Sequence, residues 1–153
     1  MENNDIIRRI RYIFDFNDSK MIELFGQGEL EVTRTQISSW LKKEEDLGFN
    51  SIFDHELAAF LNGFIIEKRG KREGPPMVAE KSLTNNIVFR KLKIALNLKD
   101  EDILQLFQEV DLRVGKHELS ALFRKPTQSQ YRVCKDQFLR NFLQAIQKKY
   151  RKN

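Results

Sequence analysis

The chain has 153 residues, 41% hydrophobic and 32% charged, with one cysteine and a formal net charge of +5. This length suits one domain or two small ones, and the lone Cys134 excludes an internal disulfide and a cysteine-based zinc site. The N-terminus lacks the apolar stretch of a signal peptide and no run approaches 18 apolar residues, so we expect a cytoplasmic protein.

The first two predicted elements are amphipathic helices. Asn4 is expected to cap a helix with apolar residues every three or four positions, because a short polar side chain can accept a bond from a first-turn N–H. Asp18 is expected to cap the second helix, which Gly26 and Gly28 should end.

The third and fourth predicted helices follow a short connector. Thr33 and Gln36 have the spacing of a capping box, in which each side chain bonds the main chain of the other residue. Asp54 is expected to cap the fourth helix, which should end at Gly70. Each helix has one apolar stripe and a polar back, so the four together predict a small bundle.

A linker and a second set of four helices complete the chain. Residues 71–83 form the predicted linker, because Gly74, Pro75 and Pro76 cannot continue a helix. In the second half, Asn86 should cap the first helix and Pro126 should end the third. The predicted organisation is a first helical repeat over residues 1–70 and a second over residues 84–153.

The two halves are related by a gapless repeat. Residues 3–70 align with residues 85–152 at an offset of 82, with 15 identities in 68 positions. No stretch alternates apolar and polar residues beside hairpin turn chemistry. The sequence therefore predicts an all-α protein of two tandem four-helix repeats that arose by internal duplication. Its core should include six aromatic residues at matched positions on the apolar faces of the helices, namely Phe25, Trp40, Phe60, Phe107, Phe123 and Phe142.

No motif for catalysis or for a cofactor is present. His55 and His117 lack the H-E-x-x-H arrangement, and the glycines do not form a phosphate-binding loop or a nucleophile elbow. The acidic run from Glu44 to Asp46 lacks the alternating ligand spacing of a calcium loop. We therefore expect no enzyme activity, no cofactor and no metal site.

Basic residues on the first helix of each half are the candidate anion contacts. Residues three apart share a helix face, so two cations stand side by side in each stripe, and arginine can hold a phosphate in a fork. The alternative is an ordinary polar helix back, or pairing with Asp15 and Asp18. The candidates are Arg8, Arg9 and Arg11, which align with Arg90, Lys91 and Lys93.

Charge is unevenly shared between the halves. Residues 1–83 hold 12 basic and 15 acidic residues, net −3, whereas residues 84–153 hold 15 and 7, net +8. Only the second half should attract polyanions.

The second and third predicted helices also resemble a helix-turn-helix. Their connector from Gly26 to Val32, however, has seven residues, whereas that motif uses a tight turn.

Several motifs together resemble the bacterial YehS-like family, over nearly the full length. They are NNDIIRRIRY from Asn3, WLKKEED from Trp40, FLNG from Phe60, KRGK from Lys68, the pair Asn85-Asn86, and DQFLR from Asp136. The resemblance implies a small, cytoplasmic, all-helical protein with two copies of one domain. It implies no activity and no catalytic residues, because the family is one of unknown function.

The expected function is therefore a non-enzymatic binding module. One class of partner is another protein or a second copy of the chain, through an apolar seam. The alternative is nucleic acid, through the first-helix stripes and the basic second half. Neither a membrane nor a small-molecule substrate is indicated.

Overall fold

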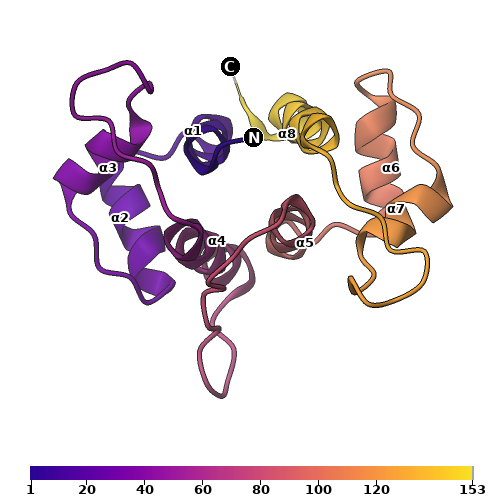
Figure 1. Cartoon of the computed structure of the whole chain (residues 1–153), viewed down its shortest axis with the longest axis horizontal. Coiled ribbons are helices and arrows are strands. Elements are labelled where there is room, and N and C mark those ends of the chain that lie inside the picture. The colour runs from indigo at the N-terminus through magenta and orange to yellow at the C-terminus, as the bar shows by residue number, and fades with distance from the viewer. Residues whose placement is uncertain (153) are drawn as a thin grey trace. The chain divides into compact units, whose positions relative to one another are not determined.

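The computed structural model describes residues 1–152 and places eight α-helices and no strand among them (Figure 1). The prediction of an all-α chain with four helices in each half is confirmed. The chain divides into two compact units, Met1–Leu83 and Thr84–Asn153. The helices are α1 (Asn3–Phe14), α2 (Asp18–Gln27), α3 (Arg34–Leu41), α4 (Asp54–Arg69), α5 (Asn85–Ala95), α6 (Asp100–Gln108), α7 (Lys116–Leu122) and α8 (Asp136–Tyr150).

Helix starts agree with the sequence in one case and differ in four. Thr33 and Gln36 form the predicted capping box at α3. The prediction that Asp18 caps α2 is wrong, because the Asn17 side chain accepts the bond from the Lys20 N–H at 2.8 Å. Asn4, Asp54 and Asn86 are also not caps. Each lies in the first turn of its helix, and Glu2, Phe53 and Thr84 hold the cap positions.

The helix ends likewise agree with the prediction in some cases and differ in others. α4 ends at Arg69 with Gly70 as its cap, as predicted. Gly26 lies inside α2, and only Gly28 follows the helix end. α7 ends at Leu122, before Pro126, so the proline does not terminate it.

The core of the first unit is built from aromatic rings of three helices. The Phe25 ring centroid lies 5.3 Å from that of Trp40 and 5.1 Å from that of Phe60. All three side chains are buried, as predicted. Helices α2 and α4 also approach closely, since a Cβ added at Gly63 would lie 1.7 Å from the Leu24 carbonyl oxygen.

The core of the second unit repeats this plan with one change. Phe107 and Phe142 are buried as predicted, and Leu122 is buried at the position equivalent to Trp40, with 3% and 4% exposure respectively. The prediction that Phe123 is a core residue is wrong: it is half-buried. It aligns with Leu41, directly after the last residue of α7, so its ring covers the rim of the core and stacks on Phe89 at 5.0 Å.

Candidate functional site

The candidate cations on α1 hold other parts of the first unit. Arg8 pairs with Asp5 one turn earlier, and its guanidinium donates to the Lys42 carbonyl oxygen at 2.6 Å, just after α3. An Arg11 guanidinium nitrogen lies 3.6 Å from an Asp18 carboxylate oxygen, at the start of α2. These two side chains therefore join α1 to the end of α3 and to the beginning of α2.

The second unit makes similar but not identical interactions. The Arg90 guanidinium donates to the Phe123 carbonyl oxygen at the end of α7. The Lys93 ammonium lies 2.9 Å from an Asp100 carboxylate oxygen and 4.3 Å from the centre of the Phe123 ring. In the alignment of the two halves, the pair Lys93–Asp100 is thus the equivalent of Arg11–Asp18.

The remaining two candidates are also buried in part. Lys91 is buried, with 8% of its surface exposed. Arg9 is half-buried, and burial lowers the pKa of its guanidinium. Within each unit, the structure therefore does not gather the six predicted residues into an open basic stripe, and four of them are engaged in tertiary contacts. Their role in anion binding stays a prediction.

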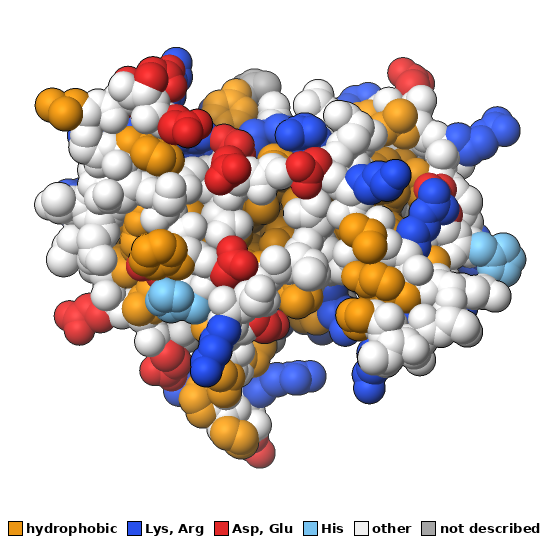
Figure 2. Space-filling model, viewed as in Figure 1, with side chains coloured by type: hydrophobic (Ala, Val, Ile, Leu, Met, Phe, Trp, Pro, Cys, Tyr) orange, Lys and Arg blue, Asp and Glu red, His pale blue; other side chains and the backbone are white. Residues whose placement is uncertain are grey.

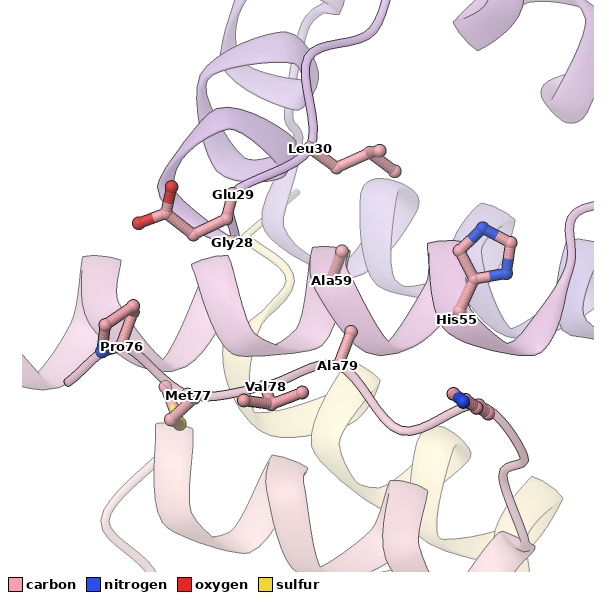
Figure 3. Close-up of a pocket in the computed structure, with 10 residues that line it drawn as sticks. Gly28, Glu29, Leu30, His55, Ala59, Pro76, Met77, Val78 and Ala79 are labelled. Atoms are coloured by element: carbon pink, nitrogen blue, oxygen red, sulfur yellow. The ribbon is translucent and has the colours of Figure 1, made fainter.

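A groove in the first unit was missed by the sequence reasoning (Figure 3). Its volume is about 620 Å³. Its floor is α4, its first wall is the turn after α2, and its second wall is part of the linker, residues 76–81, which we call the strap. The lining residues are Gly28, Glu29, Leu30, His55, Ala59, Pro76, Met77, Val78, Ala79 and Lys81.

The strap combines apolar side chains with free main-chain groups. Val78 is 86% exposed and Met77 is half-buried. Among the residues that the structure describes, none forms a hydrogen bond with the main chain of Met77, Val78 or Ala79. The signal in the sequence was the apolar run from Pro76 to Ala79 inside an otherwise polar linker.

Residues 1–152 contain no group of side chains suited to a metal ion and no helix suited to spanning a membrane. No group of three or more His, Cys, Asp or Glu side chains within this range could hold a metal ion. None of the helices described there is long and apolar enough to cross a membrane. His55 is exposed, and its ring lies 6.0 Å from that of Phe53, centre to centre.

Comparison with known proteins identifies the repeat as a family domain. The model of the family described as "Protein of unknown function (DUF1456)" matches residues 3–70 and again residues 85–152. The chain belongs to the DUF1456 family. Both DUF1456 matches coincide with the two halves of the gapless alignment, so the internal duplication is a duplication of this family's domain.

A curated relative is similar over nearly the same length. The "Uncharacterized protein YehS" of Escherichia coli (strain K12) is 44% identical over 147 residues, which cover 95% of this chain and 94% of the relative. The resemblance to the YehS-like family is therefore confirmed. No solved structure matches the chain.

Proposed function

We propose that the chain is a cytoplasmic, non-enzymatic binding module that holds an extended segment of a protein partner in the groove beside the strap. The observation that supports this proposal is the combination of apolar walls with three consecutive residues, Met77 to Ala79, whose main chain has no hydrogen-bond partner among the described residues. The Escherichia coli relative supports a bacterial origin.

Extended peptides bind many proteins through main-chain hydrogen bonds, most often by adding a strand to an exposed sheet edge. Main-chain hydrogen bonds supply much of the affinity, and pockets that receive alternate side chains supply specificity. The strap offers the first element, and the surface formed by Leu30 and Ala59 offers the second. Each Å² of apolar surface buried there contributes roughly 25 cal/mol. A partner segment with apolar residues at alternate positions fits both requirements.

The strap can be tested by selection of peptides from a displayed random library with the full chain as bait. We expect the selected peptides to carry alternating apolar residues and to bind Val78→Asp at least about tenfold more weakly. Leu47→Asp is the matched control, because Leu47 is 95% exposed in the same unit and lies outside the groove. Peptides that bind both variants equally would overturn the proposal.

The same variants address self-association. If a second copy of the chain is the partner, sedimentation equilibrium of the wild type will show a dimer that Val78→Asp dissociates. A dimer unaffected by Val78→Asp but bound by no peptide would place the interface elsewhere and contradict the strap as the binding site.

Nucleic acid is the second candidate partner. The first-helix cations give it little support, because Arg8, Arg11, Arg90 and Lys93 are engaged within their own units. One observation nevertheless favours it, namely the charge of the loop that follows α7.

A further inference from the structure

The loop between α7 and α8 is strongly basic, whereas its counterpart in the first unit is not. Residues 123–135 contain four cations and no acid, net +4. The equivalent residues 41–53 contain two cations and three acids, net −1. The cations of the second loop are Arg124, Lys125, Arg132 and Lys135, and the charged residues of the first are Lys42, Lys43, Glu44, Glu45 and Asp46.

Main-chain bonds bring both ends of this loop to one point, the end of α7. The Arg124 and Arg132 N–H groups lie 3.4 and 3.2 Å from the Ala121 carbonyl oxygen. The Arg90 guanidinium donates to the carbonyl oxygen of Phe123, two residues after Ala121. The main chain of Arg124 and Arg132 and the guanidinium of Arg90 therefore meet at the last turn of α7. We call the four cations of this loop, Arg124, Lys125, Arg132 and Lys135, the loop cluster.

Three of the four side chains of the loop cluster are open to solvent. Lys125 and Lys135 are exposed, whereas Arg124 is half-buried. Arg132 keeps 60% of its side-chain surface exposed although its guanidinium lies 3.7 Å from Glu118. The two units also differ in surface charge: in Figure 2, the visible face carries more Asp and Glu side chains over the first unit than over the second.

The loop itself is held in a defined turn. The Gln128 side-chain oxygen accepts from the Lys125 N–H at 2.7 Å, and the Tyr131 N–H donates to the Gln128 carbonyl at 3.3 Å. The cations are therefore held on an ordered turn. Between them lie neutral hydrogen-bond donors, in the sequence Thr127-Gln128-Ser129-Gln130-Tyr131.

We propose that the loop cluster binds the phosphate backbone of a nucleic acid without reading its sequence. Several cations on one ordered loop that itself contains no acidic residue attract closely spaced phosphates, and hydroxyl and amide side chains commonly add hydrogen bonds to phosphate oxygens. This site lies in the second unit, on residues other than those of the strap. It therefore goes beyond the proposed protein binding and does not depend on it.

Anisotropy titration of labelled single-stranded and duplex oligonucleotides tests this proposal on the full chain. The triple variant Arg124→Gln, Lys125→Gln, Lys135→Gln should bind at least about tenfold more weakly at roughly 100 mM salt. Its plot of log affinity against log salt should be shallower by about 2–3, since each duplex phosphate contact contributes about 0.9.

A matched control separates the loop cluster from overall charge. Lys43→Gln, Lys71→Gln, Arg72→Gln removes the same three charges from exposed positions in the first unit, and it should change affinity less than about threefold. Equal losses in both triple variants would show that only net charge matters and would overturn the proposal. Absence of wild-type binding at about 50 mM salt, or binding to heparin alone, would also overturn it. Val78→Asp should leave nucleic-acid binding unchanged, so failure of one proposal does not imply failure of the other.

Discussion

Asn4 and Asn86, which occupy equivalent positions in the repeat, make the same three hydrogen bonds in their two units. The Asn4 amide donates to the Trp40 and Asn50 carbonyls at 2.9 Å each, and its oxygen accepts from the Ile52 N–H at 3.0 Å. Asn86 bonds the equivalent groups, the carbonyls of Leu122 and Arg132 at 3.0 and 2.8 Å and the Cys134 N–H at 2.9 Å. Each asparagine thus fixes both ends of the long loop before the last helix of its unit.

Replacement of Asn4 by alanine should destabilise the first unit by about 1–3 kcal/mol, because it leaves the buried Ile52 N–H and two carbonyls without partners. Urea unfolding followed by the fluorescence of Trp40, the only tryptophan, reports on this unit. Asn50→Ala is the control, since only the main chain of Asn50 takes part. A loss in Asn4→Ala below about 0.5 kcal/mol, the low end for one net hydrogen bond, would contradict the structural role.

Gly63→Ala should destabilise the same unit by at least about 2 kcal/mol. The new Cβ would lie 1.7 Å from the Leu24 carbonyl oxygen, so α2 and α4 would have to separate. Gly26→Ala is the opposite case, because Gly26 is in α2 with no atom within 4 Å of its added Cβ. Alanine there should stabilise by about 0.5–1 kcal/mol. The same fluorescence measurement compares the two, and equal effects would contradict the close approach.

Phe142→Ala and Phe123→Ala should differ in the second unit although both residues were expected in the core. Phe142 is fully buried, so its loss should cost about 3–5 kcal/mol. Phe123 is half-buried at the rim, and its truncation should cost about 1–2 kcal/mol by apolar area. Chemical unfolding followed by circular dichroism measures both costs. Similar losses would mean that the rim contact with Phe89 contributes as much as the core.

The fold was predictable because each sequence pattern that indicates a helix occurs twice, once in each half of the chain. Apolar spacing located eight helices, and the alignment of Trp40 with Leu122 predicted two equivalent buried positions, as observed. The helix starts were less predictable because an asparagine or aspartate near a helix start can either cap that helix or bond another part of the chain. Asn4 and Asn86 bond a distant loop instead of their own first turn, and local sequence does not reveal a partner that lies so far along the chain.

The site was less predictable than the fold for the same physical reason. The groove joins Leu30, Ala59 and Val78, which are far apart in the chain and form a common surface only after α2, α4 and the strap have packed. The arginines of the first helices were visible in the sequence, but their partners were not. Arg8 contacts the main-chain carbonyl of Lys42. Every residue has such a carbonyl, so the sequence does not reveal which one becomes the partner.

Cys134 gives a prediction about pH. Burial raises the pKa of its thiol to about 12, and the nearby Asp136 carboxylate adds to this. The pKa of an unfolded cysteine is about 8.5, so the folded state holds its proton to higher pH than the unfolded state does. The resulting stability is complete below the unfolded pKa and declines as pH rises toward about 12, by up to about 1.4 kcal/mol per pH unit.

Urea unfolding between pH 7 and pH 10 should show this decline of stability in the wild type, and Cys134→Ala should reduce it. An aromatic disulfide reagent at pH 8 should label the thiol only after unfolding; rapid labelling of the native chain would contradict its burial.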